Sequence, residues 1–306
     1  MPTGRYAPSP TGPLHLGNLR TALLAWLFAR SAGHRFVLRI DDLDPDRSRE
    51  EWAARQLEEL TALGLEWDGE PLRQSERRHA YEEAIATLEG AGLLYPCFCS
   101  RREIREASQA PHGELPEGFY PGTCRELSVA EREERIAAGE QSALRVRAEG
   151  VQIGFTDRVQ GSSRSAAVDD FVVRRKDGTH GYNLAVVVDD AYQGITEVVR
   201  GADLLTSTPR HLWLADQLGL PVPTRWAHVP LVLGDDGERL AKRHGAVTME
   251  ELERDGIDAA EVRGRLAASL GLAQPEERPT AAELLERFDP AKLPTVDAAM
   301  PLPAAS

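Results

Sequence analysis

The sequence predicts an α/β fold built around a parallel sheet, with a loop-rich insert and a helical C-terminal part. Two apolar stretches near the N-terminus flank a segment with helical spacing, which is typical of a strand–helix–strand unit. Prolines and glycines interrupt residues 97–124 so often that no long regular element fits there. Residues after 245 again have helical patterning, and the chain ends in a segment rich in proline and alanine.

The expected first strands are RYA (5–7) and FVLRI (36–40). Between them, a helix is expected from Asn18 to about Gly33, because apolar side chains recur there at helical spacing. The repeating positions are Leu19, Leu23, Leu27 and Arg30. Further helices are expected over 46–63, 75–92 and 204–219, each of which ends at or near a glycine.

Later strands and turns are expected beyond a helix that follows the insert. Ser128 and Glu131 have the spacing of a capping box, which predicts that this helix begins there. The stretches that read as strands are ALRVRAE (143–149), FVVRR (171–175), YNLAVVVDD (182–190) and HVPLVL (228–233). Turns are expected at 176–178 and 235–237, and the second would place Arg239 and Lys242 on an exposed loop.

Composition excludes some classes of protein. Hydrophobic residues make up 42% and charged residues 28%, and no apolar stretch is long enough to span a bilayer. The N-terminus lacks the pattern of a signal peptide, so we expect a cytoplasmic protein whose cysteines are reduced. A net charge of -13 favours a small-molecule enzyme, and any contact with RNA would need a local basic patch.

The three cysteines, Cys97, Cys99 and Cys124, all lie in the loop-rich insert. Their thiolates offer three of the four ligands of a structural zinc site, which would stabilise a segment that lacks a core of its own. On general ligand preference the fourth ligand is His112. The alternative is three buried cysteines that bind no metal.

The segment APSPTGPLHLGN (7–18) follows an expected strand and opens an expected helix. Its glycines let the backbone approach a phosphate chain, and the helix N-terminus offers unpaired N–H groups and a partial positive charge. His15 could then contact phosphates that are being displaced. Taken alone, the segment also fits an ordinary proline- and glycine-rich loop before a helix.

In its order of motifs the chain resembles the class I aminoacyl-tRNA synthetases of the glutamyl type. PSPTGPLHLGN resembles their HIGH signature, and GERLAKRHG (237–245) is similar to their KMSKS loop, although by itself it would read as a solvated basic turn. The resemblance implies a Rossmann-like catalytic domain in which His15 and Lys242 balance charge on ATP. Implied ATP-binding residues are His15, Gly17, Asn18, Arg239 and Lys242. Arg239 and Ala241 replace a lysine and a serine of the family pattern, which leaves the fine positioning of ATP open.

Two more segments, RIDDLDPDR (39–47) and the stretch over 182–205, also match the glutamyl family. The resemblance implies a glutamate pocket formed by Arg5, Tyr6, Ala7, Pro8, Ser9, Asp41, Tyr182 and Arg200. Arg5 and Arg200 offer cations for carboxylates, and Asp41, where the family typically has glutamate, would lie near the α-amino group. An arginine at the side-chain carboxylate would reject glutamine. Alternatively, Arg200 forms a structural ion pair with Asp203 or Glu197.

The spacing of Tyr120 and Cys124 resembles one subgroup, the glutamyl-queuosine tRNA(Asp) synthetases, in which a tyrosine completes the zinc site. The implied ligands are Cys97, Cys99, Tyr120 and Cys124, while the long loop before Tyr120 keeps His112 open as an alternative. Few residues follow the KMSKS-like loop, so we expect no full anticodon-binding region. The resemblance therefore implies a ligase that transfers glutamate to queuosine in tRNA(Asp).

We expect a first catalytic half over 1–95, an inserted subdomain over 96–185, a second catalytic half over 186–245 and a helical part over 246–306. Expected partners are ATP with Mg²⁺, L-glutamate, queuosine-containing tRNA(Asp) and one structural Zn²⁺, with the protein a monomer that does not contact membranes. Alternatives are a minimal glutamyl-tRNA synthetase that charges a 3′ end, an amino-acid ligase for a small acceptor, and a non-catalytic RNA-binding paralogue. The retained HLGN motif, Lys242 and both arginines argue against the last of these.

Overall fold

A seven-stranded sheet forms the centre of the computed structural model, which describes residues 1–100, 102–104, 119–233 and 247–299. The strand order is β3-β2-β1-β9-β10-β6-β7. β6 and β7 pair antiparallel, and the other neighbours pair parallel. The strands are β1 (Thr3–Tyr6), β2 (Arg35–Ile40), β3 (Leu72–Arg73), β6 (Gln152–Asp157), β7 (Gly161–Ala167), β9 (Glu197–Gly201) and β10 (Arg225–Val229). The predicted α/β fold with a parallel sheet is confirmed.

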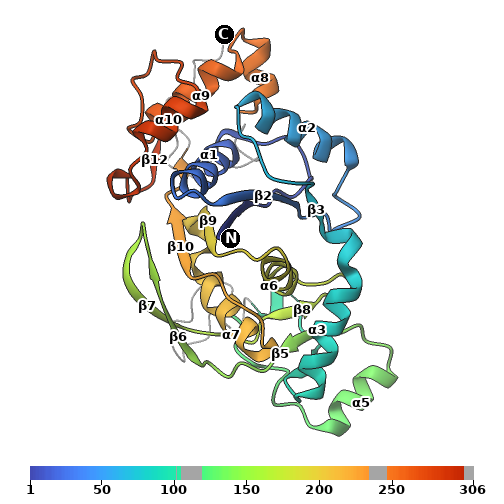
Figure 1. Ribbon diagram of the computed structural model, residues 1–306. Coiled ribbons are helices and arrows are strands. Elements are labelled where there is room, and N and C mark those ends of the chain that lie inside the picture. The colour runs from blue at the N-terminus through green and yellow to red at the C-terminus, as the bar shows by residue number, and fades with distance from the viewer. Residues whose placement is uncertain (101, 105–118, 234–246, 300–306) are drawn as a thin grey trace.

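Helices cover both faces of this sheet (Figure 1). On one face, α1 (Leu16–Ser31) packs against β1 and β9 and shares a core with the C-terminal helices. Those helices are α8 (Met249–Arg254), α9 (Ala259–Ala268) and α10 (Ala281–Arg287). On the other face, Val198 and Trp226 pack near α7 (Thr208–Leu218), while their neighbours Val199 and Ala227 join the core beneath α1. This alternation is that of strands buried on both faces.

A second sheet has three antiparallel strands in the order β4-β5-β8. They are β4 (Leu94–Cys97), β5 (Ala143–Val146) and β8 (Val172–Arg174). Their apolar side chains form a core with α3 (Arg78–Gly90), α6 (Tyr182–Tyr192) and α7. At the far end of this layer, α5 (Val129–Ala137) lies away from the main sheet (Figure 1). The Cys97–Cys124 segment leaves from the end of β4.

Several predicted elements are confirmed with small shifts at their ends. The first helix begins at Leu16, α2 spans Glu50–Ala62, and short 3₁₀ segments, η1 (Gln74–Arg77) and η2 (Ala202–Ser207), precede α3 and α7. Ser128 and Glu131 form the predicted capping box. The turn at 176–178 is present, but it leads to a single bridge between Arg174 and His180 and not to a second strand.

One prediction of element type is wrong. YNLAVVVDD (182–190) was expected to form a strand, but these residues begin α6. Residues 184–190 are all buried, because α3, α7 and the small sheet surround the helix. A helix that is buried all round has no polar face, so its apolar run has the same pattern as that of a buried strand. The hairpin of β6 and β7, rich in serine and glycine, was not predicted.

The connections at the C-terminal end involve β11 (Val232–Leu233), which pairs with β12 (Ala298–Ala299), and the 3₁₀ segment η4 (Pro290–Lys292). The predicted turn at 235–237 and residues 239–242 lie outside the described residues. The division at 95, 185 and 245 stays a prediction, although β6 and β7 from the middle part extend the main sheet. Within the described part of the chain, no helix is long and apolar enough to cross a membrane.

Candidate active site

A cavity of about 840 Å³ lies at the carboxyl ends of β1, β2, β9 and β10. This edge is where open parallel sheets commonly bind their ligands. The predicted binding residues that line the cavity are Arg5, Tyr6, Ala7, Pro8, Ser9, His15, Gly17, Asn18, Asp41, Tyr182 and Arg200. The structure thus brings together side chains from distant parts of the sequence, while their individual roles stay predictions.

The loop before α1 is closed by a capping box that His15 forms. Its Nδ1 accepts a hydrogen bond from the Asn18 backbone N–H (3.3 Å), and Asn18 Oδ1 accepts one from the His15 N–H (3.4 Å). A Cβ on Gly17 would lie 3.0 Å from the imidazole, so glycine leaves room for this arrangement. The imidazole is therefore held at the helix N-terminus, where the helix dipole favours an anion.

Helix α2 supports the same loop from behind. Gln56 Nε2 donates hydrogen bonds to the carbonyl oxygens of Ser9 (3.1 Å) and Gly12 (2.7 Å). A carboxylate oxygen of buried Glu59 accepts the Leu14 N–H at 3.1 Å. These bonds satisfy backbone groups that a loop of this composition would otherwise leave to solvent. Sequence reasoning missed both side chains, because nothing local marks a helix residue as a partner of a loop more than forty positions away.

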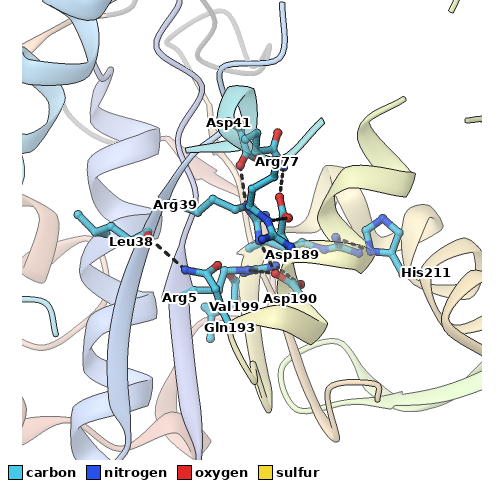
Figure 2. Close-up of polar contacts among 12 residues, drawn as sticks. Arg5, Leu38, Arg39, Asp41, Arg77, Asp189, Asp190, Gln193, Val199 and His211 are labelled. Atoms are coloured by element: carbon cyan, nitrogen blue, oxygen red, sulfur yellow. Dashed lines mark hydrogen bonds and ion pairs between the residues drawn. The ribbon is translucent and has the colours of Figure 1, made fainter. Parts of the chain in front are cut away.

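Arg5 lies at the end of β1 and forms an ion pair with Asp190 of α6 (3.3 Å). Arg39 also pairs with Asp190 (2.6 Å) and with Asp41 (2.7 Å), and Figure 2 shows these side chains converging from β1, β2 and α6. Burial would raise the pKa of Asp190, but the two arginines outweigh it and lower the pKa. Burial raises the pKa of Asp41 to about 6, against the opposing effect of Arg39.

The neighbouring Asp189 faces a different element. It accepts hydrogen bonds from Arg77 Nε (2.6 Å), Tyr81 Oη (2.7 Å) and Gln74 Nε2 (3.0 Å), which lie in η1 and α3. The Arg77 contact is visible in Figure 2 beside the Asp190 network. Consecutive carboxylates of α6 therefore attach the helix to two layers, which fixes the position of Asp190 beside Arg5 and Arg39, two residues that line the cavity.

Arg200 lies at the carboxyl end of β9 and is only 5% exposed. Its guanidinium donates to His228 Nε2 (3.0 Å), the Leu204 carbonyl (3.1 Å) and Thr208 Oγ1 (2.9 Å), and its Nη1 lies 3.3 Å from His211 Nδ1. Among the described residues, none of these four partners is a carboxylate. Burial lowers the pKa of Arg200, as expected for a cation with neutral partners.

The two histidines that contact Arg200 have lowered pKa values, which favour neutral rings at neutral pH. Burial, followed by the charge of Arg200, lowers the pKa of His211 well below its usual value. Burial also lowers the pKa of His228 despite its hydrogen bond to Asp157. Glu197, one expected structural partner of Arg200, instead pairs with Arg158. Asp203, the other, lines the same cavity.

Cys97, Cys99 and Cys124 form a cluster whose sulfur atoms all lie within 4.8 Å of one another. The Tyr120 hydroxyl lies 3.4 Å from the Cys97 sulfur and 3.7 Å from the Cys99 sulfur, and it accepts the Cys124 N–H at 2.8 Å. Ligand atoms around tetrahedral zinc are spaced by about 3.8 Å, so three sulfurs and this oxygen fit such a site. His112, the other candidate, lies outside the described residues.

The predicted residues Arg239 and Lys242 also lie outside the described residues. The described chain on either side of them does reach the site. Val232 lines the cavity, the Val247 carbonyl accepts the Leu16 N–H at 3.2 Å, and Thr248 forms a bridge with His15. The described residues that come before and after the KMSKS-like stretch therefore lie beside the HIGH-like motif.

Residues 3–286 match the family described as tRNA synthetases class I (E and Q), catalytic domain. The chain belongs to this family. A glutamyl-Q tRNA(Asp) synthetase from Nocardia farcinica is 58% identical over 291 residues, which are 95% of this chain and 90% of that protein. Another protein with this name, from Symbiobacterium thermophilum, is 50% identical over a match that covers 96% of this chain and 94% of that protein.

Among solved structures, a glutamate tRNA ligase from Elizabethkingia meningosepticum, crystallised with its amino acid, has the same class I synthetase architecture. The two structures superpose with a TM-score of 0.80 at 27% sequence identity, and the match covers 98% of this chain and 67% of the ligase chain. The predicted class I synthetase fold and the resemblance to glutamyl-queuosine tRNA(Asp) synthetases are both confirmed. Membership of this class I synthetase family makes the chain a ligase whose substrates are ATP, an amino acid and a tRNA.

Proposed function

We propose that the protein activates L-glutamate with ATP and transfers it to queuosine in tRNA(Asp). The observation that carries the proposal is the single cavity that joins the HIGH-like loop to Arg5, Asp41 and Arg200. Glutamate has two carboxylates and one ammonium group, and this cavity offers buried cations and a buried carboxylate within the same space. The names of the similar proteins support the same reaction.

In the first step, the α-carboxylate of glutamate attacks the α-phosphorus of ATP in line, and pyrophosphate leaves. His15 at the α1 N-terminus, Lys242 and the Mg²⁺ that accompanies ATP balance the developing negative charge, and Gly17, Asn18 and Arg239 bind the nucleotide. Arg200 binds the side-chain carboxylate together with Arg5, and Asp41 binds the ammonium group. Tyr6, Ala7, Pro8, Ser9 and Tyr182 form the walls of the glutamate pocket.

In the second step, a hydroxyl of queuosine attacks the activated carbonyl of glutamyl-adenylate and AMP leaves. No enzyme nucleophile is required, so positioning and electrostatics supply most of the rate acceleration. The choice of queuosine as acceptor is supported by the names of the similar proteins. Because tRNA is the acceptor, the proposed reaction takes place in the cytoplasm, and we propose that the enzyme acts as a monomer.

We propose one structural Zn²⁺ bound by Cys97, Cys99, Tyr120 and Cys124. The observed clustering of three sulfurs and the Tyr120 hydroxyl supports this set of ligands. The ion would stabilise a segment whose described residues form a small apolar cluster that includes Phe98 and Tyr120.

The proposal is tested by incubating the protein with ATP, Mg²⁺ and labelled glutamate. The acceptors are tRNA(Asp) with queuosine, the same tRNA without queuosine, and tRNA(Glu). The expected result is label in the first tRNA alone. Label in tRNA(Glu) would indicate a minimal glutamyl-tRNA synthetase. Glutamate-dependent pyrophosphate exchange without transfer to any tRNA would indicate a ligase for a small acceptor, and absence of exchange would contradict an enzymatic role.

A further inference from the structure

Behind Arg200 lies a buried pair that the reaction above does not use, Asp157 of β6 and His228 of β10. Both side chains are fully buried, and His228 Nδ1 lies 2.6 Å from Asp157 Oδ2. Asp157 Oδ1 also accepts the backbone N–H groups of Val159 (2.9 Å) and Gln160 (2.8 Å). Asp157 Oδ2 also accepts the backbone N–H of His228 itself at 3.0 Å. The carboxylate therefore cannot rotate away from the imidazole without losing backbone hydrogen bonds from three residues.

This geometry fixes which ring nitrogen of His228 carries the proton. Burial lowers the pKa of His228, so the ring is neutral and has one N–H. The Asp157 carboxylate can only accept, which assigns the hydrogen to Nδ1 and leaves a lone pair on Nε2. That lone pair faces Arg200 Nε at 3.0 Å, and Arg200 can only donate. The three groups form a directed chain from carboxylate to imidazole to guanidinium.

We propose that His228, oriented by Asp157, is a positioning residue that sets glutamate affinity by holding the Arg200 guanidinium in its binding orientation. This inference rests on the proposed function, because it assigns the side-chain carboxylate of the amino acid to Arg200. The neutral imidazole holds the guanidinium without neutralising its charge, whereas a carboxylate in the same place would compete with the substrate. The charge of Arg200 thus remains available to an acidic ligand.

Two substitutions at His228 separate positioning from packing. In His228→Gln, the side-chain amide oxygen reaches the place of Nε2 and can accept from Arg200. In His228→Asn, the shorter amide can bond Asp157 but does not reach Arg200. Both remove the same ring, which packs against Phe155 and Trp226, so they lose similar packing.

We expect His228→Asn to raise the KM for glutamate in pyrophosphate exchange by about tenfold or more, with little change in kcat or in the KM for ATP. His228→Gln should recover most of this loss. Glutamine activation, measured in the same assay, should rise relative to glutamate in the asparagine variant. Equal KM values for glutamate in the two folded variants would overturn the proposal.

Asp157→Asn provides a second test that does not alter the imidazole. The amide oxygen takes the backbone N–H groups of Val159 and Gln160, so its NH₂ group faces His228 Nδ1 and shifts the imidazole proton to Nε2, toward Arg200. The same NH₂ group replaces the acceptor of the His228 backbone N–H, so folding of the variant is checked by circular dichroism. The KM for glutamate should again rise, and an unchanged KM in a folded variant would overturn the proposal.

A matched control is His34→Asn, because His34 is also buried and lies 3.6 Å from a carboxylate, that of Glu197, but does not line the cavity. It should leave the KM for glutamate unchanged, and a rise like that of His228→Asn would overturn a local role. The proposed function fails separately, if the wild-type protein shows no glutamate-dependent exchange.

Discussion

Two arginines at one cavity meet opposite electrostatic surroundings. Arg5 is paired with Asp190, which it shares with Arg39, whereas the partners of Arg200 among the described residues are neutral. An arginine whose hydrogen bonds go to neutral acceptors has no direct ion pair, although Asp190 offsets part of its charge from a distance. Burying such a cation is costly unless a ligand supplies the anion. The side chain of Arg200 is therefore the main candidate for recognition of the substrate's acidic group.

Replacing Arg200 with alanine should abolish most glutamate activation and leave the fold intact. The lost charge-assisted hydrogen bonds should lower kcat/KM for glutamate by about a hundredfold or more. The measurement is glutamate-dependent pyrophosphate exchange, with circular dichroism as a check on folding. An unchanged KM for glutamate would remove Arg200 from the pocket.

The pH dependence of glutamate activation should reflect Asp41. Its pKa is raised to about 6 by burial, so its carboxylate is charged above that pH and becomes neutral below it. A neutral carboxyl group does not pair with the substrate ammonium, and kcat/KM for glutamate should fall about tenfold for each pH unit below the pKa. Asp41→Asn should be weakly active and lack this step. A flat wild-type profile between about pH 5 and pH 7 would contradict the assignment.

At this scale the sequence predicts the side chains that face the cavity better than those that hold them. Arg5, Asp41 and Arg200 could be found because each belongs to a motif with a recognisable pattern. Asp157 and His228 come from two neighbouring strands that lie 71 positions apart in the sequence, and neither has a local signal. Their relation depends on strand order, which a single sequence does not specify.

At the scale of elements, α6 illustrates the limit of periodicity. Its sequence reads as a strand, since valines follow one another and the run is short. Tertiary packing decides otherwise, because Asp189 must reach η1 and α3 while Asp190 reaches β1 and β2. In a strand, consecutive side chains would point to opposite faces of the sheet. In helix α6, the side chains of Asp189 and Asp190 are instead separated by about 100° around the helix axis.

The cysteine segment should depend on its metal. Cys99→Ser is expected to lower bound zinc, measured by elemental analysis of the purified protein, and to increase proteolysis between residues 97 and 124. Unchanged metal content would refute the zinc site. For the fourth ligand, Tyr120→Phe should weaken zinc binding and His112→Ala should not. The opposite pattern would assign the ligand to His112.

At the scale of the whole molecule, the C-terminal helices belong to the largest core. Val262, Leu266 and Leu284 are buried with α1, and Phe288 packs edge-on against Phe28 at a ring distance of 5.2 Å. The predicted helical character of this part is confirmed. The surface to which it attaches, α1 on one face of the main sheet, could not be predicted, because an amphipathic pattern does not identify the surface that it covers.

Phe288→Ala should destabilise the protein by about 2–4 kcal/mol, because it leaves a cavity beside α1. The measurement is chemical unfolding followed by tryptophan fluorescence, and Val296→Ala, at a residue that is 70% exposed, is the control. The control should change stability by about 0.5 kcal/mol or less. If Phe288→Ala left the main transition unchanged, the C-terminal helices would unfold independently of the sheet.

The neutral surroundings of Arg200 also affect how this pocket can change during evolution. Loss of Arg5 would leave Asp190 with one cation fewer in a buried site, and loss of Asp190 would take this carboxylate from Arg5 and leave Arg39 paired with Asp41. Loss of Arg200 would leave no carboxylate without an ion-pair partner among these contacts, since they are a hydroxyl, a carbonyl and two neutral rings. Preference for an acidic substrate can therefore be altered at position 200 by one mutation, whereas position 5 is constrained by its neighbours.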